Sequence, residues 1–186
     1  MPSDTVEKII ISAEKQARSG GYNGFSFREI AKEIGIKSAS IHYHFPTKTD
    51  LATELTRRYT ERFENKLNAI ASANKTLHSK LLAYANEFYE AAKSKNKMCL
   101  CGLFTAEIDI LPDAVADKLQ QFFKLNEQWL MVQLSQHDTP RQGEQTPQNV
   151  ALQLIATTEG AILLAKAFKS QNYFHDAVDL SAFPSL

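Results

Sequence analysis

Three helix-ending signals divide the first 46 residues of this sequence into short amphipathic segments. Gly20-Gly21 ends a segment over about residues 4–19, Gly35 ends a second over about 27–34, and Phe45-Pro46 ends a third over about 38–44. A long helix cannot continue through breaks at this spacing, and no alternating strand pattern accompanies them. The region is therefore predicted to fold as three short helices joined by tight turns.

The second and third segments have the spacing of a helix-turn-helix. Ser26 and Glu29 form a capping-box sequence at the start of the second segment. Ala31 provides a small residue where two steeply crossed helices touch, and Gly35 tolerates the positive φ that the turn requires. Ile41 faces the small core between them. The pattern predicts that the helix at 38–44 projects outward and can enter the major groove of DNA.

Local charge and side-chain size agree with DNA contact at this helix. The chain has a formal net charge of zero, which argues against nucleic-acid binding through bulk positive charge. Residues 26–48, however, carry four basic and two acidic side chains. Ser38, Ala39 and Ser40 are small enough to approach base edges, and Lys37 and Lys48 are placed to approach phosphates.

The run from Phe25 to Leu51 resembles the signature of the TetR/AcrR family of repressors, including its closing Phe-x-x-Lys-x-x-Leu segment at Phe45, Lys48 and Leu51. The resemblance implies a homodimer that represses transcription from a pseudo-palindromic operator until a small-molecule inducer binds its C-terminal domain. It also implies that Arg28 and residues 38–40 approach bases, while Tyr43, His44 and Lys48 approach phosphates. The predicted DNA-binding set is Arg28, Lys37, Ser38, Ala39, Ser40, His42, Tyr43, His44 and Lys48.

The two histidines of this set leave alternatives open. The family usually has tyrosine where this chain has His42, so the contact made there is undetermined. His42 and His44 are either phosphate contacts or solvated or packing side chains. If they contact phosphates, operator affinity should rise below about pH 6.5 as imidazolium forms. The alternative for the whole module is a structural three-helix cap with no DNA contact.

The rest of the chain reads as longer amphipathic helices over about 47–70, 76–93, 98–108, 112–135, 147–169 and 172–182. Thr47 and Asp50 offer a second capping box at the start of the first of these. The predicted fold is all-α with about nine helices. Residues 1–46 would form the helix-turn-helix DNA-binding domain, and residues 47–186 a ligand-binding and dimerisation domain.

Two sites are predicted in the C-terminal part. The family's ligand cavity lies among helices placed here at 51–135, and its candidate lining is Phe88, Met98, Cys99, Phe104, Glu107, Phe122, Phe123 and Trp129. Plain core packing is the alternative for the aromatic residues, and a helix-terminal salt bridge is the alternative for Glu107. Dimerisation is expected through the helix at 147–169 together with the last helix, because small residues on the first of these allow two helices to pack closely. The alternative is that the helix at 147–169 is an internal core helix. The candidate interface residues are Ala156, Thr157, Gly160, Ala161 and Leu164.

Other classes of function find little support. No catalytic set, phosphate loop or metal-type spacing is present, so neither an enzyme nor a metal or other cofactor is expected. A helical enzyme or ligand carrier that keeps the N-terminal module for docking is the rival hypothesis, and an activator is the rival within the DNA-binding class. Cys99 and Cys101 are either small hydrophobes or sensors of oxidants or electrophiles.

The expected location is the cytoplasm. Two cysteines suit a reducing compartment, and the N-terminus lacks a secretory signal. Gln153, Glu159 and Lys166 interrupt the most apolar stretch, so no membrane span is expected.

Overall fold

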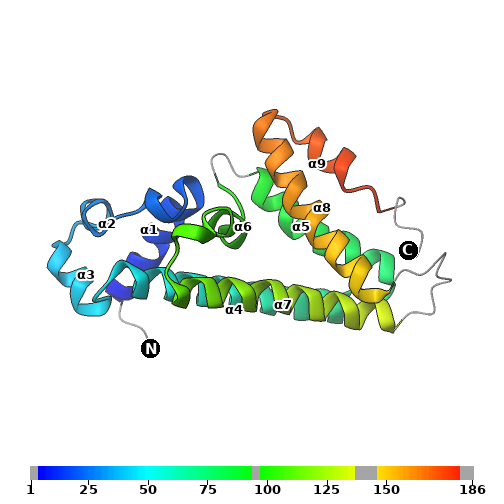
Figure 1. The fold of residues 1–186 in the computed structure, drawn as a ribbon, viewed down its shortest axis with the longest axis horizontal. Helices are drawn as coiled ribbons and strands as arrows, with labels where there is room; N and C mark the ends of the chain where they lie inside the picture. Colours follow the sequence, from blue (N-terminus) through cyan, green and yellow to red (C-terminus); the bar gives the residue numbers. More distant parts are fainter. Residues whose placement is uncertain (1–3, 94–96, 137–145, 181–186) are drawn as a thin grey trace. The chain divides into compact units, whose positions relative to one another are not determined.

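The computed structural model describes residues 4–93, 97–136 and 146–180, and within these ranges all regular structure is helical (Figure 1). This confirms the predicted all-α class and the nine α-helices. The α-helices are α1 (Asp4–Gly20), α2 (Phe27–Ile34), α3 (Ser38–His44), α4 (Lys48–Ala73), α5 (Leu77–Lys93), α6 (Leu100–Thr105), α7 (Asp113–Ser135), α8 (Pro147–Ala167) and α9 (Asn172–Ala177). Two short 3-10 helices, η1 (Tyr22–Gly24) and η2 (Ile108–Ile110), complete the described chain.

The chain folds into two compact units. The first unit contains Met1–Glu61 and Asn96–Gln121, and the second contains Arg62–Lys95 and Phe122–Leu186. The boundary expected at residues 46/47 lies inside the first unit, which takes in the first half of α4 and the segment around α6 as well as the predicted DNA-binding module.

Local signals at the ends of α2, α3 and α4 explain where these helices begin and end. The Ser26 hydroxyl accepts a hydrogen bond from the Glu29 amide at 3.2 Å, which starts α2. Gly35 ends α2 with φ +73°, and the Ile36 amide then donates to the Ala31 carbonyl. Only half of the predicted box forms at Ser26, because the Glu29 carboxylate contacts Arg28 instead.

The second predicted box forms completely. Thr47 donates its amide to Asp50 at 2.9 Å, and the Asp50 amide donates to the Thr47 hydroxyl at 3.1 Å. This exchange fixes the start of α4 directly after the turn that ends α3.

The core of the first unit lies beneath α1, α2, α3 and the start of α4. Its side chains are aliphatic or aromatic and almost completely excluded from water: Ile9, Ile10, Ala13, Phe25, Ile30, Ile41, Leu51 and Leu55. Their positions along α1 follow the i, i+3, i+4 rule, as the sequence predicts. A glutamate on α2 adds a polar link, because the Glu33 carboxylate accepts hydrogen bonds from Ser12, Lys15 and Gln16 of α1.

The second unit is built on an aromatic cluster and the helix α8. The cluster comprises Phe63, Tyr84, Phe88, Phe122 and Trp129, with ring centroids of neighbouring pairs 5.2–6.4 Å apart. Its polar atoms are paired: the Tyr84 hydroxyl lies 3.0 Å from Asn126 Oδ1, and the Trp129 indole donates to the Leu67 carbonyl at 3.1 Å. Helix α8 packs against α5 and α9.

Helix α8 is long and apolar enough to cross a membrane, judged by length and composition alone, despite Gln153, Glu159 and Lys166. In the structure, 44% of its apolar window is buried inside the protein, and eight of its side chains face the core, as in the core helix of a globular protein.

Two predicted elements differ from the observed ones. The helix expected over 98–108 is shorter, because Glu107 adopts φ −110° and ψ 20°, outside the α-helical range, and separates α6 from η2. The helix expected over 172–182 is also shorter and ends at Ala177, because Val178 leaves the α-helical range with φ −98° and ψ 61°. The loop expected at 136–146 lies largely outside the described residues.

Candidate nucleic-acid interface

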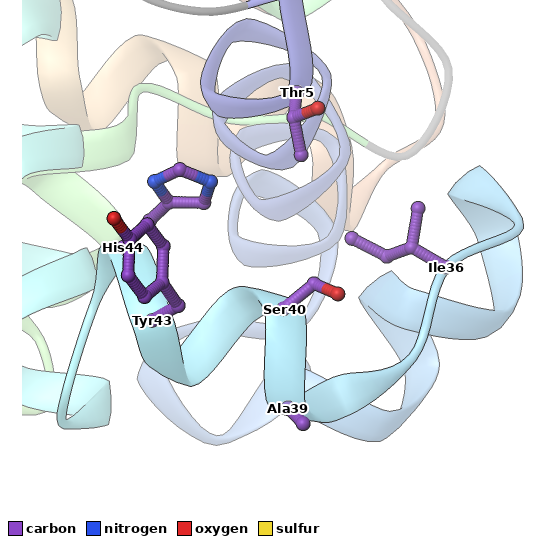
Figure 2. Close-up of a pocket in the computed structure, with 6 residues that line it drawn as sticks. All are labelled: Thr5, Ile36, Ala39, Ser40, Tyr43 and His44. Atoms are coloured by element: carbon purple, nitrogen blue, oxygen red, sulfur yellow. The ribbon is translucent and has the colours of Figure 1, made fainter.

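Helix α3 displays nearly all of its side chains to solvent. Of its seven residues, all of which the structure describes, only Ile41 is buried. Tyr43 is 84% exposed, and Ala39, Ser40 and His42 are exposed beside it. Figure 2 shows Ala39, Ser40, Tyr43 and His44 along α3, with Thr5 of α1 and Ile36 completing the lining of a shallow hollow. A short helix held by one core residue thus presents small, hydroxylated and aromatic groups outward.

Two basic residues near α3, Arg28 and Lys37, are exposed to solvent. The Arg28 side chain is 88% exposed and forms an ion pair with the neighbouring Glu29 carboxylate, at 3.4 Å. Lys37 is exposed at the N-cap of α3, and its carbonyl accepts a hydrogen bond from the Ser40 amide. Both side chains can reach an anion outside the protein without breaking a buried contact.

His42 makes packing contacts in the DNA-free chain. Its ring lies edge-on to Phe27, with 4.6 Å between centroids, and Nδ1 lies 3.2 Å from the Pro46 carbonyl oxygen. Since a carbonyl only accepts, Nδ1 carries the proton in this contact. His44, which is half-buried, has its ring 5.0 Å from that of Tyr43. These contacts support a packing role for His42, and a phosphate contact at either histidine stays a prediction.

Lys48 at the first turn of α4 has a more enclosed position. Its ammonium lies 4.6 Å from the centroid of the Tyr22 ring and 4.7 Å from that of Phe25. Burial lowers the pKa of Lys48, and the negative charge of Glu107 partly opposes this shift. The cation is therefore held in an aromatic notch formed by Tyr22 and Phe25.

Comparison with known proteins identifies the module. Residues 9–55 match the model of the family described as bacterial regulatory proteins, tetR family. A solved TetR transcriptional regulator from Legionella pneumophila is 32% identical, with a TM-score of 0.87 over 95% of each chain. The chain belongs to the TetR family. It is accordingly a DNA-binding transcriptional regulator, and the family's members are ligand-responsive repressors.

Other relatives agree with this membership. The regulator LmrA of Bacillus subtilis is 24% identical over 171 residues, which cover 90% of this chain and 89% of LmrA. The probable regulator YttP of the same organism is 36% identical over 72 residues, and that match spans only 35% of YttP.

The structure divides the predicted ligand-lining residues of this TetR-family chain between its two units. Phe88, Phe122 and Trp129 belong to the aromatic cluster of the second unit, and Phe123 packs edge-on against Phe122 at 5.3 Å. Met98, Cys99, Phe104 and Glu107 belong to the first unit. The Glu107 carboxylate accepts a hydrogen bond from the Tyr22 amide at 2.6 Å, a contact that the sequence did not predict, and its role in ligand binding stays a prediction.

The predicted dimer residues lie on α8 but do not share one face. Ala156 is exposed, Thr157 and Gly160 are half-buried, and Leu164 is 41% exposed. Ala161 is 1% exposed and packs into the core of its own chain. Helix α8 also exposes two larger apolar side chains, Leu152 and Leu163.

The two cysteines lie next to a buried tyrosine in the first unit. Cys99 and Cys101 are both buried and form no disulfide, and the Cys99 sulfur accepts a hydrogen bond from the Gly102 amide at 3.5 Å. Beside them, burial raises the pKa of the Tyr59 hydroxyl well above its usual value. No group of three potential metal ligands occurs among the described residues.

Sequence reasoning missed one pair of contacts near the module. The Arg18 side chain donates to the Met98 carbonyl at 2.7 Å, and the Met98 amide donates to the Arg18 carbonyl at 3.0 Å. Eighty residues separate these partners, so no local spacing could reveal the pair.

Proposed function

We propose that this TetR-family chain is a homodimeric repressor that places α3 of each copy in successive major grooves of a pseudo-palindromic operator, and that a small-molecule inducer releases it. The observation that carries the proposal is the outward display of α3, with Tyr43 84% exposed and Ile41 completely buried. A short helix with small residues at its start fits the groove without steric conflict.

The exposed side chains support a division of labour at the interface. Ser38, Ala39 and Ser40, together with the exposed Arg28, are proposed to contact base edges, which carry sequence information. Lys37, Tyr43, His44 and Lys48 are proposed to contact phosphates, which position the protein on DNA. His42 is proposed to act mainly by packing on Phe27.

The dimer is proposed to form through the exposed face of α8. Ala156, Thr157, Gly160 and Leu164 allow close helix packing, and Leu163 contributes apolar area that water covers in a single chain. A two-fold contact of this kind also suits a palindromic operator, since two modules on one DNA combine their affinities.

The inducer is proposed to bind near the aromatic cluster of the second unit. Phe88, Phe122 and Trp129 offer apolar contact area, and the Tyr84 hydroxyl and Asn126 amide offer hydrogen-bonding groups that could be exchanged for those of a ligand. The regulator is proposed to act in the cytoplasm, where it would meet its operator DNA.

Selection of genomic fragments by the purified chain tests the proposal. We expect saturable binding to a short inverted repeat, a steep decrease in affinity as salt rises, and reduced transcription in vitro from the adjoining promoter. Binding that shows no preference among fragments would contradict the operator-binding role. Increased transcription would show that the protein is an activator and not a repressor.

A further inference from the structure

The Glu107 carboxylate is seated directly on the turn between α1 and α2. Its Oε2 accepts the Tyr22 amide at 2.6 Å, and a Cβ atom added to Gly21 would overlap the carboxylate. Gly21 has φ +70° and ψ −162°, a conformation that side chains disfavour. Glycine at this position therefore serves two purposes, since it makes the turn and leaves room for the carboxylate.

The turn fixed by Glu107 carries the two rings that hold Lys48. Tyr22 and Phe25 pack edge-on with 6.0 Å between centroids, and the Lys48 ammonium lies within 4.7 Å of both centroids. Burial in this notch disfavours the charged ammonium, and Glu107 opposes that effect. Glu107 thus acts on Lys48 in two ways, through the geometry of the rings and through its charge.

The segment that carries Glu107 is attached to the same module at further points. Phe104 of α6 packs edge-on against Tyr22 with 6.0 Å between centroids. At the start of the segment, Arg18 and Met98 exchange the two hydrogen bonds described above. Residues 98–107 are therefore held at both ends against α1 and the turn that follows it.

We propose that Glu107 is a positioning residue for DNA binding, which holds the Gly21–Tyr22 turn so that the Lys48 ammonium stays placed for a DNA phosphate. This inference rests on the proposed phosphate contact of Lys48. It assigns Glu107 to the DNA-binding module, 59 residues beyond Lys48 in the sequence. Glu107 itself touches no DNA in this account, because its carboxylate faces the backbone of the turn.

A double-mutant cycle with Lys48→Ala and Glu107→Ala tests the inference on the full-length dimer. We expect Glu107→Ala alone to weaken operator binding by about tenfold and to lower the salt slope by about 1.8, the value for two phosphate contacts, one from each subunit of the dimer. In the Lys48→Ala background, Glu107→Ala should change affinity less than twofold, since the residue it positions is gone. Glu107→Gln should lose less than Glu107→Ala, because the amide oxygen can still accept the Tyr22 N–H.

Asp109 provides the matched control, since it is an exposed carboxylate two residues further along the same segment. Asp109→Ala should leave affinity and salt slope unchanged, and thermal unfolding should show that all variants are folded at the assay temperature. Fully additive effects of the two substitutions, or an unchanged salt slope in Glu107→Ala, would overturn the positioning role. If Lys48→Ala has no effect on operator affinity, Lys48 makes no phosphate contact, and that part of the proposed function is contradicted.

Discussion

Helices α3 and α8 both expose side chains that their own chain does not cover, but the chemistry of those side chains is opposite. Helix α3 exposes Ala39, Ser40 and Tyr43, which are small or carry hydroxyl groups. Helix α8 exposes Leu152 and Leu163, each about half accessible. Polar groups on α3 can exchange water for the polar edges and phosphates of DNA, whereas leucines gain only from an apolar partner.

The two helices also differ in how firmly they are anchored. Eight side chains of α8 are buried, whereas α3 is anchored by Ile41 alone. A short helix with one core residue approaches DNA closely because little of it is covered. Exposure alone therefore does not define a binding surface. The type of exposed side chain indicates the partner, and the number of buried side chains indicates how sensitive the helix is to a core substitution.

The largest expected effect concerns the apolar face of α8. Leu164→Glu would place a charge in the proposed interface between two copies, where it cannot be solvated. We expect a monomer by sedimentation and a decrease in operator affinity of about a hundredfold or more, because the second half-site contact is lost.

Leu82 on α5 gives the control for this substitution, since it is a 56% exposed leucine on a helix outside the proposed interface. Leu82→Glu should remain a dimer with normal affinity. A dimeric Leu164→Glu protein would show that α8 does not form the interface as proposed.

The second effect concerns the single anchor of α3. Ile41→Ala should lower the free energy of unfolding by about 2–5 kcal/mol, the range for large core truncations, and Ile41→Val by about 0.5–1.5 kcal/mol. Urea denaturation followed by circular dichroism measures both. A loss below 0.5 kcal/mol for Ile41→Ala would mean that α3 is not anchored through this residue.

A smaller effect separates base contacts from phosphate contacts within the interface. Ser40→Ala should alter the preferred bases at one position of each half-site, with a discrimination change of about 1–3 kcal/mol. Lys48→Ala should weaken binding to all sequences alike and reduce the salt slope by about 1 for each subunit of the dimer. Fluorescence anisotropy with a panel of operator variants measures both; identical profiles for the two variants would contradict the division.

The smallest effect concerns the link between α1 and α2. Hydrogen bonds from Lys15 and Gln16 lower the pKa of Glu33 from 4.5 to about 2. A lowered folded-state pKa stabilises the fold above pH 4.5, and this contribution is lost as the pH falls from 4.5 towards 2. Glu33→Gln should therefore cost less than about 1 kcal/mol at pH 7, because the link is exposed.

Urea unfolding of both proteins at pH 7, 4 and 3 measures this contribution. The stability difference between wild type and Glu33→Gln should shrink at pH 3. A difference that grows on acidification would contradict the sign of the shift.

Local signals explain why much of the fold was predictable. The hydrogen bonds made at Ser26, at Gly35 and between Thr47 and Asp50 join residues that are three or four positions apart. Their effect on helix ends can therefore be predicted from the sequence. The outward display of α3 follows from the same kind of pattern, because a helix with one apolar position can bury only that position.

The contacts that sequence reasoning missed span long separations or depend on helix rotation. Glu107 finds its partner 85 residues away, and the helix periodicity around it gives no indication of Tyr22. Ala161 and Gly160 are both small, but neighbouring residues on an α-helix point about 100° apart. Composition suggested a close-packed α8, and only the structure shows that Ala161 faces inward.

Methylation interference on the selected operator tests most directly whether α3 enters the major groove. Guanine N7 lies in the major groove and adenine N3 in the minor groove, so methyl groups at the two atoms report on different grooves. If α3 enters the major groove, N7 methylation will block binding in two patches about one helical turn apart, on one side of the duplex. Interference from adenine N3 alone would contradict it.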